Sequence, residues 1–254
     1  LWLPASLLLI FIAPFGFWAR ARGLAGARNT GHTAACTAIG VVLALFLYWV
    51  AGWALMFGDT AGGAFGTSGF LAALSGAAPA ISRMFLFQAA LCAAAIALLA
   101  GAVAGRMTVP GFLLVAAFVS AFLYPLYGHW AWYGIVAHRE GWMQSVAFLD
   151  YGGATVVHAV PAWAALAALR VAGPRPGRFT AEGLPGPVTA ASVPWSVLGM
   201  ALVSAMWIGV QGLFFLPPSA APGLLLAGAG GLLTALLLSQ LLARRLRVDW
   251  WTNG

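Results

Sequence analysis

Long apolar runs with very few charged residues are the feature that most limits what this chain can fold into. Seven runs approach or exceed the roughly 20 residues that a helix needs to cross a bilayer, and only 7% of the 254 residues are charged. A soluble domain carries about 25% charged residues, so these charges are too few to cover a water-facing surface. The runs span about Leu1–Trp18, Ala34–Phe57, Met84–Ala104, Gly111–Val136, Gly152–Val171, Pro194–Leu216 and Ala221–Leu242.

Helices are the expected form of these runs, because hydrocarbon offers no partner for an open backbone N–H or carbonyl group. A membrane barrel would need strict alternation of apolar and polar residues over segments of about ten residues, and these runs do not alternate. Turn-forming glycine and proline residues cluster in the connections, at 62–66, 173–177 and 217–218. The sequence therefore predicts an all-α, multi-pass protein of a cell membrane, a polytopic bundle of about seven spans.

The placement of arginine predicts how the bundle is oriented. All 12 basic residues are arginine, and they are scattered between the runs rather than gathered in a patch, which argues against nucleic acid as a partner. The positive-inside rule assigns the arginine-rich side to the cytoplasm, so we expect the N-terminus outside and the end of this chain in the cytoplasm. Only Arg83 and Arg139 fall on the other side; the remaining ten are Arg20, Arg22, Arg28, Arg106, Arg170, Arg175, Arg178, Arg244, Arg245 and Arg247.

His158 lies near the middle of the fifth run, where polar groups are costly and are functional candidates by default. An imidazole at that depth can exchange a proton near neutral pH, or it can hold two helices together through a hydrogen bond. Asp150 stands where the same helix should begin, and its simplest role is a cap on the helix N-terminus. It could instead attract cations to an outer vestibule.

The fourth run carries the aromatic segment Tyr124-Pro-Leu-Tyr127-Gly-His129-Trp130-Ala-Trp132. One interpretation is the aromatic belt common at membrane interfaces. The other is a cage that binds a small cation through its ring faces. We expect His129, near the outer end of the run, to make structural hydrogen bonds, and Gln88 in the third run to bond between helices.

No pattern in the sequence indicates an enzyme, a cofactor or a metal. There is no nucleotide loop, zinc-ligand spacing or hydrolase triad, and no pair of carboxylates is placed for acid–base chemistry. Cys36 and Cys92 fall inside apolar runs, where we expect them to pack as small hydrophobic residues.

These residues, in this order, resemble the ammonium transporter (Amt/Rh) family. The similarity is strongest at 124–132 and in Asp150-Tyr-Gly-Gly-Ala-Thr-Val-Val-His158, where family members typically read Asp-Phe-Ala-Gly-Gly-Thr-Val-Val-His. It covers essentially the whole chain. Weaker matches are Arg22-Gly23, Arg28-Asn29, Phe87-Gln88, 101–107 and 206–211.

The resemblance implies a fold of about eleven spans, built from two inverted five-helix repeats and assembled as a homotrimer. By this comparison the chain is an N-terminal fragment of a divergent member. Residues 1–172 correspond to the first repeat and 194–254 to the start of the second. The family's second pore histidine is then expected beyond Gly254.

The resemblance also assigns roles to individual residues. Phe87 and Trp132 match positions that line an outer cation site, and His158 matches the first of two pore histidines. Asp150 matches the family's usual aspartate at the start of the fifth helix. Stripping water from a full charge is expensive, so a pore histidine would take the proton or bond the ligand while ammonia passes.

Several expected pore positions depart from the family pattern. Leu91 and Val210 stand where the family usually has two gate phenylalanines, and Phe214 replaces a serine near the outer cation. Trp207 is also expected along the pore. Gln211 and Gly105 replace an asparagine and a glutamate. The family scaffold is therefore matched better than the pore mouth.

Two functions follow from the resemblance. The first is an ammonium transporter or channel subunit, with ammonium and the lipid bilayer as its partners and possible control by a cytoplasmic regulatory protein. The second is a non-conducting ammonium sensor fused to a cytoplasmic signalling domain. A membrane enzyme is a third interpretation, but the spans lack a catalytic constellation.

Overall fold

A computed structural model describes residues 2–24, 29–73, 76–137, 140–184, 186, 192–213 and 220–244. Within this part of the chain, seven helical segments are long and apolar enough to cross a membrane, and each overlaps one predicted run. The prediction of a seven-span helical bundle is therefore confirmed. The segments are Ala5–Leu24, Thr30–Phe57, Pro79–Ala102, Val109–Trp132, Ala154–Ala172, Val193–Val210 and Leu225–Leu242.

Four spans lie within single α-helices, and the other three each contain a π-helical segment. The single helices are α1 (Trp2–Leu24), α4 (Pro79–Ala102), α10 (Val193–Leu213) and α11 (Ala220–Ala243). The composite spans are α2 (Thr30–Leu47), η2 (Tyr48–Gly52) and α3 (Trp53–Phe57); α5 (Val109–Phe118), η3 (Val119–Leu123) and α6 (Tyr124–Trp132); and η5 (Ala154–Ala159) and α9 (Val160–Ala172). Single π-helical turns inside α-helices are often found at functional sites.

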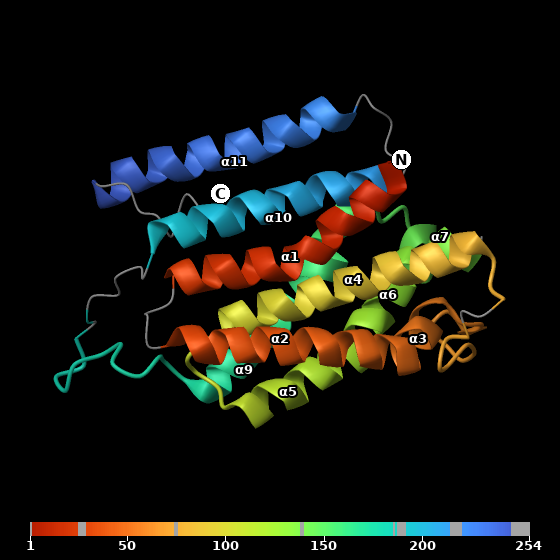
Figure 1. The fold of residues 1–254 in the computed structure, drawn as a ribbon, viewed down its shortest axis with the longest axis horizontal. Coiled ribbons are helices and arrows are strands. Elements are labelled where there is room, and N and C mark those ends of the chain that lie inside the picture. The colour runs from red at the N-terminus through yellow and green to blue at the C-terminus, as the bar shows by residue number, and fades with distance from the viewer. Residues whose placement is uncertain are drawn as a thin grey trace.

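The connections gather at the two ends of the bundle. At one end lies a hairpin of β1 (Thr60–Ala61) and β2 (Phe65–Gly66), in which Thr60 pairs with Gly66. Three short helices follow α6, namely α7 (Gly134–Ala137), α8 (Trp142–Ser145) and η4 (Tyr151–Gly153). Helices α3 and α7 lie at the same end, whereas the connection after α9 lies at the opposite end (Figure 1).

Helix α4 forms the centre of the bundle. Of the residues in its apolar window 78% are buried, against 6% in the window of α11. Helix α4 packs against α1, α2 and α9, and α11 lies at the edge of the bundle beyond α10 (Figure 1). A residue on α4 is therefore surrounded by protein, which makes this helix a suitable support for a site inside the bundle.

Helix α1 extends six residues beyond the predicted end at Trp18. Arg20 and Arg22, which were expected in a loop, instead occupy its last turns. A cation near a helix C-terminus is favoured because the helix dipole is negative there. Close packing on α10 also supports this extension, since a Cβ atom on Gly199 would lie only 2.3 Å from the backbone nitrogen of Arg20.

Candidate functional site

His158 lies in the π-helical segment η5 and is held between two aromatic side chains. Its ring stacks on Trp207 of α10, with centroids 5.6 Å apart and an interplanar angle of 15°. Phe17 of α1 meets the same ring edge-on at 6.1 Å. The Nε2 atom of His158 is buried and has no hydrogen-bond partner within the described ranges. The ring is thus held by packing while one nitrogen remains available to a ligand.

Asp150 caps the start of the helix that carries His158. Its two carboxylate oxygens accept hydrogen bonds from the backbone N–H groups of Thr155 and Val156, each at 3.0 Å. The Asp150 side chain is buried, so these charge-assisted bonds are shielded from water. This geometry matches the capping interpretation of the sequence, and it fixes the turn immediately before His158.

Gly153, the second of the two glycines between Asp150 and His158, has a steric reason to be there. Gly153 has a φ of +79°, and a Cβ atom at this position would lie 2.4 Å from Cγ2 of Val157 and 3.2 Å from Cη2 of Trp132. Only glycine fits such a contact without displacement of a neighbour. The Asp-Tyr-Gly-Gly segment therefore lets the chain turn tightly beneath Trp132 before the fifth span begins.

Phe87 and Trp132, the expected outer-site residues, both belong to the buried core. The indole nitrogen of Trp132 donates a hydrogen bond to the backbone carbonyl of Asp150 at 3.0 Å. Beside Phe87, the Gln88 side chain accepts a hydrogen bond from the Tyr124 hydroxyl at 3.4 Å. This bond joins α4 to α6, as predicted for Gln88.

The remaining polar groups of the aromatic segment tie α6 to the hairpin end of the bundle. Nδ1 of His129 lies 2.9 Å from the carbonyl oxygen of Met56, and Nε2 lies 2.9 Å from the Thr60 hydroxyl. Because a carbonyl only accepts, Nδ1 carries the proton and Nε2 accepts from Thr60. Trp130 donates to the carbonyl of Ala64 at 2.7 Å. His129 thus has the structural role that the sequence predicted.

The expected pore-lining residues have different surroundings. Leu91 and Val210 are fully buried, and Trp207 is half-buried against His158. Phe214 lies outside the described residues.

Sequence reasoning missed Phe17, because a phenylalanine within an apolar run has no pattern that marks it as a neighbour of a distant histidine.

Comparison with known proteins gives the family. The model of the Ammonium Transporter Family matches residues 1–254. A candidate ammonium transporter of Synechocystis sp. is 37% identical over 265 residues, which cover 100% of this chain and 49% of that protein. Ammonium transporter Amt2 of Archaeoglobus fulgidus is 28% identical over 211 residues, which cover 79% of this chain and 44% of that protein. The chain thus spans about half the length of these curated relatives.

Solved structures share the arrangement of helices. A structure described as "Sensor Amt Protein" matches with a TM-score of 0.91 at 25% identity, over 99% of this chain and 64% of that one. Candida albicans Mep2 matches in fold with a TM-score of 0.81 at 22% identity, over 99% of this chain and 57% of that one. The chain covers only the first part of this fold. With the family model matched from the first residue to the last, the chain belongs to the ammonium transporter family, a family of membrane transporters rather than enzymes.

Proposed function

We propose that the protein containing this chain carries ammonium across a cell membrane, as a transporter or channel. The observation that carries the proposal is the setting of His158, a histidine inside a spanning segment whose Nε2 atom is buried and unpartnered among the described residues. A polar group so placed in a membrane span needs a ligand or a proton relay to justify its cost.

The proposed route begins at Phe87 and Trp132, whose ring faces would attract the cation. It continues past the aliphatic side chains of Leu91 and Val210, whereas Phe214, also expected along the pore, lies outside the described residues. At His158 and Trp207 the ligand meets a ring nitrogen that can accept or donate a hydrogen bond. Asp150 supports this route by fixing the helix start rather than by exchanging protons.

Uptake of methylammonium into proteoliposomes that hold the full-length protein tests this function. We expect flux above that of empty liposomes, and we expect His158→Ala to reduce it strongly while the protein still assembles in detergent. His129→Ala is the matched control. It also removes a histidine, but one whose two ring nitrogens already have partners, Met56 and Thr60, and so are not available to a ligand. Equal flux in the wild type and His158→Ala would contradict the role proposed for His158.

An ammonium sensor is the second candidate function. It is favoured by the match to the structure described as "Sensor Amt Protein" and by the replacement of both gate positions with Leu91 and Val210. A sensor would bind ammonium without conducting it. Absence of methylammonium flux, together with an ammonium-dependent output from a cytoplasmic signalling domain, would favour this candidate over the transporter.

We further propose that the full-length protein forms a homotrimer with its N-terminus outside and residue 254 on the cytoplasmic side. Residues 1–172 would form the first inverted repeat and 194–254 the beginning of the second. A cytoplasmic regulatory protein or a fused signalling domain would then act on the arginine-rich face.

A further inference from the structure

Thr155 has a hydroxyl group for which the structure provides no partner. It is the second residue of η5 and of the fifth span. Its Oγ1 atom is buried, and nothing in the described part of the chain makes a hydrogen bond with it. A buried polar group without a partner is rare, and it is costly in a membrane, where no water can replace the missing bond. Neither the Asp150 cap nor the pore histidine explains this hydroxyl.

Four other hydroxyl groups in the spans are satisfied by their own helix. Those of Thr33 and Thr37 in α2 donate to the carbonyl oxygen four residues earlier, each at 2.8 Å. Ser120 of η3 does the same at 2.8 Å, and Ser204 of α10 at 3.0 Å. A serine or threonine inside a helix commonly bonds in this way. Thr155 therefore differs from these residues in its surroundings rather than in its chemistry.

The turn before η5 explains why Thr155 lacks this bond. Gly152 and Gly153 both have left-handed backbone angles, with φ of +77° and +79°. The carbonyl groups that precede Thr155 are therefore not stacked as in a continuous helix, and its hydroxyl bonds to none of them. The backbone N–H of the same residue is satisfied by Oδ1 of Asp150 at 3.0 Å. The turn thus fixes the backbone of Thr155 and leaves its hydroxyl oxygen free.

Thr155 lies between two parts of the proposed route. The turn immediately before it packs beneath Trp132, since a Cβ atom on Gly153 would be 3.2 Å from Cη2 of that ring. His158 follows three residues later, which is less than one turn of a π-helix, and its Nε2 atom is also buried without a partner in the described ranges. Two unsatisfied polar atoms therefore occur in one short segment, in the order in which a molecule coming from Trp132 would meet them.

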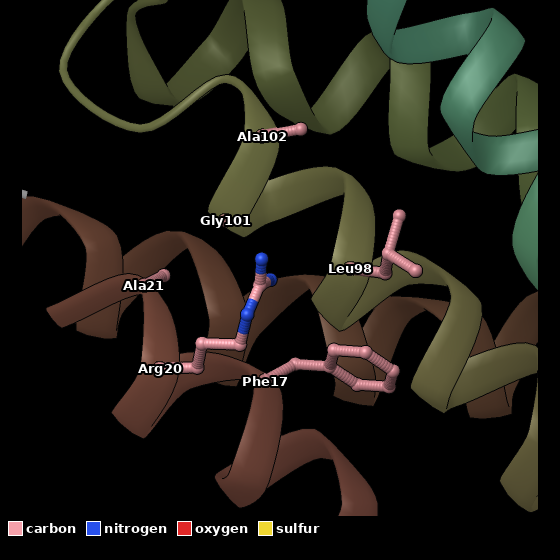
Figure 2. A pocket seen from close by; sticks show the side chains of 6 residues that line it. All are labelled: Phe17, Arg20, Ala21, Leu98, Gly101 and Ala102. Atoms are coloured by element: carbon pink, nitrogen blue, oxygen red, sulfur yellow. The ribbon is translucent and has the colours of Figure 1, made fainter. Parts of the chain in front are cut away.

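The other side of His158 leads away from Thr155. There the ring of His158 meets Phe17, which also lines a cavity of about 200 Å³ between α1 and α4 (Figure 2). This cavity lies near the last turns of both helices, at the end of the bundle opposite α7 (Figure 1). Its lining consists of Phe17, Arg20, Ala21, Leu98, Gly101 and Ala102. Thr155 thus belongs to the approach from Trp132 and not to the space beyond His158.

The charge near Thr155 favours a cation as the missing partner. The Asp150 carboxylate accepts hydrogen bonds from the backbone N–H groups of Thr155 and Val156, so its negative charge is held at this turn. A hydroxyl oxygen has two lone pairs that accept hydrogen bonds, and the ammonium ion has only N–H donors. A bond to Oγ1 would replace one of the water contacts that the ion loses on entering the bundle.

We propose that the Thr155 hydroxyl is a binding group for ammonium, which accepts a hydrogen bond from the ion between Trp132 and His158. This inference rests on the proposed function, in that ammonium enters the His158 pathway, and it applies equally to a transporter and to a sensor. Thr155 contributes affinity for the ion, whereas Asp150 holds the threonine in place.

Thr155→Val tests the proposal, because valine has nearly the same shape and lacks the hydroxyl. Ammonium chloride should raise the unfolding temperature of the full-length protein in detergent, relative to sodium chloride at equal ionic strength. The ammonium concentration needed for the same rise should be about tenfold higher in Thr155→Val, as expected for the loss of one hydrogen bond to a charged group. Without ammonium this variant should be at least as stable as the wild type, since it loses no bond within the protein.

Thr37→Val is the matched control, because Thr37 is also buried in a span and its hydroxyl is bonded to the carbonyl of Thr33. It should leave the ammonium dependence unchanged. Thr155→Ser keeps the hydroxyl and should also retain the wild-type dependence. An unchanged dependence in Thr155→Val, or an equal weakening in either of the other variants, would overturn the proposal. A loss of stability in Thr155→Val without ammonium would overturn it too, because the hydroxyl would then have a structural partner.

Transport measurements separate this proposal from the proposed function. In proteoliposomes, the methylammonium concentration for half-maximal uptake should rise about tenfold in Thr155→Val. A wild type without uptake, combined with a weakened ammonium dependence in Thr155→Val, would reject the transporter and support the binding role of Thr155. Uptake that depends on His158 but is unchanged in Thr155→Val would reject the role of Thr155 alone. A wild type that is neither stabilised by ammonium nor able to take up methylammonium would overturn both.

Discussion

The indole N–H of Trp132 donates a hydrogen bond to the backbone carbonyl of Asp150 at 3.0 Å. This bond joins the last residue of α6 to the residue whose side chain caps the start of η5. The residue proposed for the outer cation site is therefore fixed to the helix that carries His158. A substitution of Trp132 or of Asp150 should therefore also alter the structure around the other residue.

Trp132→Phe tests this connection, because it keeps an aromatic face and removes the N–H donor. The Asp150 carbonyl would be left buried without this partner, which should cost about 1–3 kcal/mol of unfolding free energy. Thermal unfolding in detergent measures the loss. Trp163→Phe is the control, since Trp163 is 70% exposed and should change stability by no more than about 0.5 kcal/mol. Equal stability of both variants would contradict the role of the bond.

Asp150→Asn distinguishes a cap from a cation attractor. Asparagine offers one acceptor oxygen where the carboxylate uses two, so one backbone N–H near η5 should lose its partner, at about 1–3 kcal/mol. We expect a lower unfolding temperature. Asp59→Asn removes the same charge from the exposed hairpin end and should have a much smaller effect. Unchanged stability combined with weaker ammonium binding would instead identify Asp150 as a cation attractor.

Gly153→Ala should destabilise the fold more than a glycine-to-alanine substitution at a position where no atom lies near the added Cβ. A left-handed backbone costs an alanine roughly 1–2 kcal/mol, and at Gly153 the Cβ atom also meets Val157 and Trp132. Gly62→Ala is the matched control, because its φ is +58° and no atom lies within 4 Å of the added Cβ. Chemical or thermal unfolding of both variants gives the comparison. Equal losses of unfolding free energy in the two variants would show that the contacts of the added Cβ with Val157 and Trp132 do not destabilise the fold.

Cysteine labelling tests the number of crossings and the orientation. With Cys36 and Cys92 replaced by alanine, Arg178→Cys and Arg139→Cys should react from opposite sides of the membrane, Arg178→Cys from the cytoplasm. These positions are separated by a single span, Ala154–Ala172. Labelling of both from the same side would contradict the span count between them.

The spans could be predicted from sequence because the bilayer sets a minimum apolar length. Cap and turn residues such as Asp150 and Gly173 also lie where the sequence placed them. The end of α1 could not be predicted, since an arginine that follows an apolar run is typical of a loop and the helix continues past it to Leu24. Helix α1 continues there because of its packing against α10, which a linear pattern does not contain.

The environment of His158 was predictable only in part. Its depth in the membrane followed from the run that contains it, whereas its neighbours come from α1 and α10, far away in the chain. The π-helical segments were also unforeseen. Their wider hydrogen-bonded turns are stabilised by local packing against other helices, and no residue preference distinguishes them from the α-helices on either side.

The π-helical turn of η5 has a consequence for how this span tolerates insertions and deletions. A π-helical turn accommodates one residue more than an α-helical turn. Loss of a single residue from Ala154–Ala159 could therefore be absorbed by a return to regular α-helix, with no gap in the backbone. The flanks on either side would then keep nearly the same relative orientation, because the deletion removes the one extra residue that the wider turn holds. We therefore expect a protein with that deletion to insert and fold, with α9 still packed against α4.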